Sequence, residues 1–116
     1  MIAVIFEVWP NPDHKSNYLE IASELRESLS AIDGFISVER FESITDEGKI
    51  LSLSFFENEE AVEQWRNLQD HRKAQSLGRK GYFLDYRLRV ADVKRDYSMS
   101  DRRQVPDDSK EVHKSP

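Results

Sequence analysis

The feature that most constrains the fold of this sequence is the order in which its hydrophobic patterns change. Residues 2–9 are rich in β-branched and aromatic side chains and end at a Pro-Asn-Pro break (10–12), which predicts a buried strand. Across residues 13–32 apolar side chains recur every three or four positions, as on the buried stripe of an amphipathic helix. Gly34 stands where a residue in the left-handed conformation would close that helix.

The rest of the pattern predicts two strands, a helix and a final strand. Residues 35–42 and 49–56 read as strands, and residues 45–48 supply the polar side chains and the glycine of a hairpin turn. Asn58 is a suitable N-cap for a second helix, whose first turn carries carboxylates that favour the helix dipole. Residues 82–93 read as a long last strand.

This order predicts an α+β domain with the ferredoxin-like β-α-β-β-α-β arrangement, an antiparallel sheet with both helices on one face. In the predicted hairpin both strand faces are apolar, since Leu51, Leu53 and Phe55 alternate with Ile50 and Phe56 on the other side. Two helices can cover only one face of the sheet. A second copy of the chain is the simplest cover for the other face, so we expect a homodimer.

The composition limits the domain count and the classes of partner. The 116 residues suit one domain over 1–97, and the polar tail 98–116 is expected to be disordered or to contact a partner. A net charge of −5 argues against a nucleic-acid partner. The absence of cysteine excludes disulfides and thiolate metal sites, and it fits a cytoplasmic protein. The short apolar N-terminus contains Glu7 and lacks a basic leader, so neither a signal peptide nor a membrane span is expected.

Most side chains suited to hold a small aromatic molecule lie between positions 65 and 97. Trp65, His71 and Gln75 follow one another around the second predicted helix, with His71 and Gln75 one turn apart. An imidazole and an amide on one rim suit a phenol or a carbonyl group, and His71 is the candidate general base. Arg79 is placed to clamp an anionic or enolate oxygen, and the hydroxyl of Tyr86 is a further polar contact.

Each of these residues also has a structural interpretation. His71 could be a surface or interface histidine, and Trp65 lies on the apolar stripe as a core anchor would. Arg79 could form an ion pair with Asp70 or Asp85.

Tyr86 alternates with Leu84 and Leu88 and is expected to share their face of the last strand. A buried tyrosine there would more often bond a neighbouring backbone group than a ligand. Ser52 and Ser54 place small polar groups on one face of the sheet, but no base partner is evident and we assign them no catalytic role. The three histidines show no metal-binding spacing.

Residues 2–97 resemble the antibiotic biosynthesis monooxygenase (ABM) domain, most closely its small stand-alone bacterial members. The resemblance rests on DGFISVERFES after the first helix, on the Asn58-Glu59-Glu60 helix entry, on the Trp65…His71…Gln75…Gly78-Arg79 series and on the Tyr86…Arg89-Val90 strand. The family forms dimeric α+β barrels. Characterised members oxygenate phenolic polyketide intermediates or quinols without metal or flavin, and the substrate supplies the electrons that reduce O2.

The resemblance implies a homodimeric, cofactor-independent monooxygenase that acts on a small aromatic or quinol-type molecule, with O2 as co-substrate. It makes His71 the candidate base, Trp65 part of the cavity wall, and Gln75, Arg79 and Tyr86 polar contacts. Haem-degrading relatives use an Asn on the first strand, where this sequence offers Glu7, so haem degradation is disfavoured. The alternatives are a non-catalytic small-ligand-binding or stress-associated dimer, or a purely structural interaction protein.

Overall fold

The computed structural model describes the backbone of residues 1–76 and 81–110, and the side chains of the same residues except 69–76. The elements follow the predicted order, with two short helices added. They are β1 (Ile2–Pro10), the 3-10 helix η1 (Pro12–His14), α1 (Lys15–Leu29), β2 (Phe35–Glu42), β3 (Ile50–Phe56), α2 (Glu59–Ser76), β4 (Phe83–Asp92) and α3 (Asp107–Lys110).

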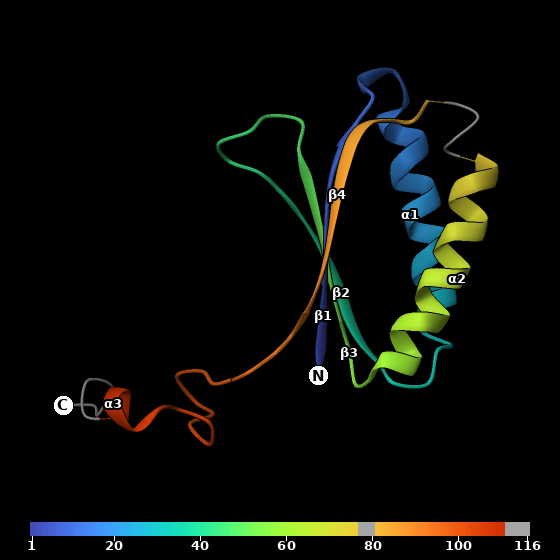
Figure 1. The fold of residues 1–116 in the computed structure, drawn as a ribbon. Coiled ribbons are helices and arrows are strands. Elements are labelled where there is room, and N and C mark those ends of the chain that lie inside the picture. Colours follow the sequence, from blue (N-terminus) through green and yellow to red (C-terminus); the bar gives the residue numbers. More distant parts are fainter. Residues whose placement is uncertain (77–80, 111–116) are drawn as a thin grey trace.

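The four strands form one antiparallel sheet in the order β2-β3-β1-β4, and both long helices lie on the same face of it (Figure 1). The central strand β1 pairs Val8 with Ile50 on β3 and with Tyr86 on β4. Each β-α-β segment crosses over one intervening strand, as the strand order requires. The predicted α+β, ferredoxin-like fold is therefore confirmed.

The core lies between β1, β3 and the two helices. Alternate residues of β1 point toward the helices, and the side chains of Val4 and Val8 are almost completely buried there, together with Phe56 and Val62. Full burial of one such side chain contributes roughly 1.5–3 kcal/mol to stability. One cluster gathers around Phe56 and Trp65, and a second around Phe6 and Tyr18.

The start of α2 is fixed as the sequence predicts, whereas Gly34 has a different role. Asn58 caps α2 by accepting the backbone N–H of Ala61 through Oδ1 at 3.0 Å. Gly34 has a positive φ of 92°, but α1 already ends at Leu29, so the glycine does not close the helix. A Cβ at Gly34 would lie 3.1 Å from the Cβ of Ala61, and the glycine carbonyl accepts the N–H of Glu57 at 2.7 Å. Gly34 therefore lets the chain entering β2 pass close to the start of α2.

The sheet face turned away from the helices is largely apolar, and no described element covers it (Figure 1). It carries alternate residues of β1 and β3, among them Ile5, Leu51 and Leu53. At its middle the carboxylate of Glu7 pairs with Lys49 and Arg89. Hydrogen bonds from these two cations hold the pKa of Glu7 below its usual value.

Beyond β4 the chain runs away from the sheet and forms a small separate knuckle that ends in α3 (Figure 1). Among the described residues, the contacts within the knuckle are local. The Arg102 guanidinium lies 5.6 Å from the Tyr97 ring, and Arg103 pairs with Asp101 at 2.7 Å. Within the described residues, no helix has the length and apolar character needed to cross a membrane.

Candidate functional site

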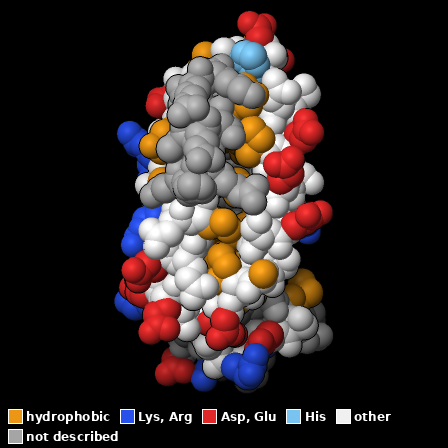
Figure 2. Space-filling model, turned by 90° about the vertical axis from the view of Figure 1, so that its right-hand side faces the viewer, with side chains coloured by type: hydrophobic (Ala, Val, Ile, Leu, Met, Phe, Trp, Pro, Cys, Tyr) orange, Lys and Arg blue, Asp and Glu red, His pale blue; other side chains and the backbone are white. Residues whose placement is uncertain are grey.

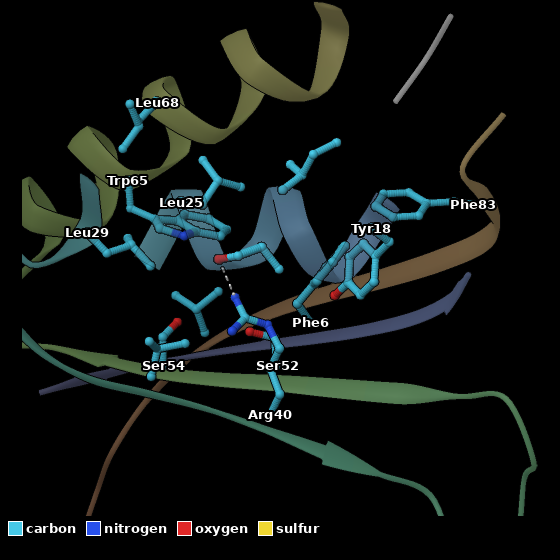
Figure 3. Close-up of a pocket in the computed structure, with 14 residues that line it drawn as sticks. Phe6, Tyr18, Leu25, Leu29, Arg40, Ser52, Ser54, Trp65, Leu68 and Phe83 are labelled. Carbon is cyan, nitrogen blue, oxygen red and sulfur yellow. Dashed lines mark hydrogen bonds between the residues drawn. The ribbon is translucent and has the colours of Figure 1, made fainter. Parts of the chain in front are cut away.

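A cavity of about 40 Å³ lies between the helix pair and the sheet (Figure 3). Most of its wall is apolar and comes from every layer of the core. The apolar lining consists of Val4, Phe6, Ile21, Ala22, Leu25, Leu29, Val38, Trp65, Leu68 and Phe83. The polar lining consists of Tyr18, Arg40, Ser52 and Ser54. At this volume the cavity admits water-sized molecules, so a larger ligand requires side chains in its wall to move.

The helix side of the cavity wall is partly exposed to solvent. Ile21 and Leu25 of α1 and Leu68 of α2 line the cavity and are also partly exposed. Figure 2 shows apolar side chains running along this face between charged ones. A ligand that displaces these three side chains would therefore enter between the two helices.

Trp65 satisfies both of its sequence-based interpretations. Its side chain is only 5% exposed, and its ring lies 6.3 Å from that of Phe56, as expected of a core anchor. The same ring forms one end of the cavity (Figure 3). Its wide apolar surface excludes water from that end.

Arg40 is the functional candidate that the sequence analysis missed. It lies on β2 opposite Ser52 of β3, and its side chain rises from the sheet toward α1 (Figure 3). One terminal nitrogen, Nη2, donates to the backbone carbonyl of Ala22 at 3.0 Å. The signal was present in the sequence, because strand alternation places Arg40 on the same face as the apolar Val38.

Tyr18 and the two serines complete the polar part of the wall. Burial raises the pKa of Tyr18, while the charge of Arg40 and a hydrogen bond from it act in the opposite direction. The Tyr18 ring packs edge-on against Phe83 at 5.4 Å. Ser52 and Ser54 point toward the helices, so the small polar face noted in the sequence is the floor of the cavity.

Tyr86 lies beside this site and is not among its described lining residues. Its ring is 5.6 Å from Phe6 and 6.2 Å from Phe83, and the residue is 51% exposed. The register of β4 shifts between Trp9 and Pro10, so Phe83 joins Tyr86 on the helix side of the sheet. Simple alternation had assigned that place to Leu84, which is largely exposed.

Three predicted site residues fall outside the described side chains. His71 and Gln75 belong to the C-terminal half of α2, of which only the backbone is described, and Arg79 lies in the undescribed segment 77–80. Their roles as base and polar contacts remain predictions.

The described part of the site can bind a mostly apolar molecule through one polar group. A guanidinium and hydroxyl groups suit an anionic oxygen or an enolate, and the low dielectric of the surrounding wall strengthens such contacts. No group of three or more potential metal ligands (His, Cys, Asp or Glu) occurs among the described residues.

Comparisons with known proteins identify relatives of the whole domain. Residues 1–77 match the family model for antibiotic biosynthesis monooxygenase. A fungal protein named jasmonate monooxygenase ABM, from Pyricularia oryzae, is 47% identical over 93 residues; these are 80% of this chain but only 43% of the fungal protein. The uncharacterized bacterial protein YqjZ, from Bacillus subtilis, is 28% identical over 93 residues, which are 80% of this chain and 79% of YqjZ.

Solved structures share the fold at low sequence identity. Rv0793 from Mycobacterium tuberculosis superposes with a TM-score of 0.72 at 19% identity, covering 84% of this chain and 98% of Rv0793. A Deinococcus radiodurans protein proposed to belong to the same family gives a TM-score of 0.73 at 12% identity, covering 84% of this chain and 97% of its own. Each superposition includes nearly all of the solved structure. In each one, about a sixth of this chain has no counterpart.

Proposed function

Because this chain belongs to the antibiotic biosynthesis monooxygenase family, we propose that it is a monooxygenase that oxygenates a small organic molecule with O2 in the cavity between helices and sheet. The observation that carries the proposal is the cavity itself. Its apolar wall includes Trp65 and Phe83, and its polar groups include Arg40. Such a site excludes water while it stabilises a negatively charged oxygen, which are the two physical requirements of this chemistry.

The proposed substrate is a small aromatic or quinol-type molecule, and no protein-bound cofactor is required. A substrate with an acidic CH2 beside an aromatic carbonyl or phenol can supply all the electrons. Its CH2 is oxidised to C=O, one oxygen atom of O2 enters the product, and the other leaves as water with the two hydrogens. His71 is the proposed base, and the anion that it leaves reduces O2. The positive charge of Arg40 favours an anionic substrate in the cavity.

The name of the fungal relative adds jasmonate as a second substrate to test. Hydroxylation of an unactivated C–H bond has a different electron balance, because reduction of the second oxygen atom to water needs two further electrons. A jasmonate reaction would therefore need a two-electron donor such as NADPH, whereas the quinol-type reaction would not. Assays with and without the donor distinguish the two reactions.

We also propose that the protein is a homodimer in which the open sheet face is buried. This face exposes apolar side chains, including Phe41, and has a groove of about 420 Å³ lined in part by Ile5 and Leu51. An apolar surface of this kind on a sheet is typical of an interface. The Glu7 ion cluster lies within this surface and is a polar contact available to the partner.

The proposal is tested by O2 uptake in metal-stripped protein with a panel of hydroquinones and anthrone-like phenols, and with jasmonate plus NADPH. We expect uptake above the buffer blank with at least one substrate class. His71→Ala should abolish turnover but not binding, because it removes the proton acceptor. Binding without uptake for every compound would instead support the non-catalytic, ligand-binding alternative.

A further inference from the structure

Arg40 is a cation in a mostly apolar cavity, and its charge has no acidic partner among the described side chains. None of the ion pairs found among the described residues involves Arg40. The neighbouring acids do not reach it: Glu39 is exposed on the opposite face of β2, and Glu42 pairs with Lys15 at 3.5 Å. The positive charge therefore faces the cavity without neutralisation from the described side chains.

The guanidinium is also incompletely hydrogen-bonded. Its Nε is buried and has no hydrogen-bond partner among the described residues, whereas Nη2 donates to the Ala22 carbonyl at 3.0 Å. A buried donor without an acceptor costs about 1–3 kcal/mol, and more when it is charged. The Ala22 contact fixes the direction of the guanidinium of Arg40, which lines the cavity.

The other polar groups of the cavity are also suited to bind a ligand oxygen. The hydroxyls of Tyr18 and Ser52 line the cavity beside Arg40, and both can donate a hydrogen bond. Ser52 lies directly across the strand pair from Arg40 (Figure 3). One guanidinium with flanking hydroxyls matches a planar carboxylate, which carries one charge and accepts paired N–H donors. A phosphate carries more charge than this single cation can balance.

We propose that Arg40 is the anchor for a carboxylate, so that the substrate class of this site is a small hydrophobic carboxylic acid. The carboxylate would occupy the existing cavity. The apolar body of the ligand would lie against Trp65 and displace Leu25 and Leu68 between α1 and α2. The catalytic meaning of this assignment rests on the proposed function. The binding preference itself does not.

The test is a binding comparison between an acid and its uncharged counterparts, without O2 turnover. Cinnamate, methyl cinnamate and cinnamamide share one apolar body, and their affinities are measured by calorimetry or ligand-observed NMR at pH 7. We expect the wild type to bind cinnamate at least tenfold tighter than either neutral compound. Equal affinity for all three compounds, or no binding of cinnamate, would overturn the proposal.

Variants assign the preference to Arg40. Arg40→Gln should weaken cinnamate binding by about ten- to hundredfold while leaving the neutral compounds nearly unchanged. Arg66→Gln, at an exposed position on α2, is the matched control and should change nothing. If Arg40→Gln does not fold, as judged by thermal melting, Ser52→Ala provides the second test, with an expected loss of about threefold to tenfold for cinnamate alone.

The two proposals fail in different ways. If carboxylates bind preferentially through Arg40 but no O2 is taken up, the Arg40 proposal stands and the monooxygenase proposal fails. The protein would then be a binding module. Uptake with neutral quinols and no preference for acids would leave the oxygenase in place and remove the anchor.

Discussion

At the residue scale, the site depends on two polar side chains that the fold carries into a mostly apolar layer. Arg40 and Tyr18 contact the same cavity from β2 and α1, and neither stood out in the sequence. Tyr18 falls on the apolar stripe predicted for the first helix, and the sequence analysis assigned no role to Arg40. Periodicity assigns a residue to a face, but it does not show which faces enclose a cavity. Trp65 was found because its type, as well as its position, is unusual.

Tyr18 provides a pH-dependent prediction. Burial raises its pKa in the folded state above the unfolded value, so the unfolded chain releases this proton first as the pH rises. The contribution of Tyr18 is therefore complete below about pH 10 and is lost as the pH rises toward the folded-state pKa. As the pH rises above 10, we expect the free energy of unfolding to fall less for Tyr18→Phe than for the wild type, as measured by urea unfolding. The same loss in both proteins would contradict this, and Tyr97→Phe in the exposed tail is the control.

At the element scale, hydrophobic periodicity predicted both long helices and all four strands, and the strand boundaries are correct to within one residue. It did not predict the register shifts at Phe35/Ser37 and at Trp9/Pro10. Each shift brings an extra aromatic residue, Phe35 or Phe83, to the helix side of the sheet. A bulge depends on pairing between strands distant in sequence, so the pattern within one strand cannot show it.

The approach of β2 to α2 can be tested at Gly34. Gly34→Ala should destabilise the protein by about 1–3 kcal/mol, because it combines a left-handed backbone with a close contact to Ala61. Gly48→Ala is the matched control, since Gly48 has a similar φ of 88° but no atom within 4 Å of an added Cβ. Chemical unfolding should therefore show a larger loss for Gly34→Ala. Equal losses would mean that the contact with Ala61 does not matter.

The N-cap of α2 gives a smaller, separate prediction. Asn58→Ala removes the acceptor of the Ala61 N–H and should cost about 1 kcal/mol of unfolding free energy. Asn58→Asp keeps an acceptor oxygen at the N-terminus of the helix and should retain most of the stability. Equal destabilisation of both variants in urea titrations would show that the side-chain acceptor at position 58 does not stabilise α2.

At the scale of the whole molecule, the sequence predicted one open apolar sheet face, and the structure contains it. The partner that would cover this face stays a prediction, because one chain cannot show what covers it. That the tail 98–116 is disordered or contacts a partner likewise stays a prediction. The described part of the tail forms a knuckle outside the sheet-and-helix body.

The homodimer is tested by placing a charge on the open face. Leu53→Glu should halve the molar mass measured by light scattering, because a buried carboxylate without a partner strongly disfavours the interface. Leu19→Glu, on the solvent side of α1, should leave the mass unchanged. A monomeric wild type, or a Leu53→Glu variant with the wild-type mass, would contradict the proposed interface.

We propose that O2 reacts with the substrate in the cavity between the helices and the sheet. The most direct test is turnover under 18O2 with mass analysis of the product, in the wild type and in Ser52→Leu, which fills the cavity floor. We expect one 18O atom per product molecule in the wild type and no catalysed product from the filled variant. Unlabelled product, or equal labelled product from a correctly folded Ser52→Leu variant, would contradict it.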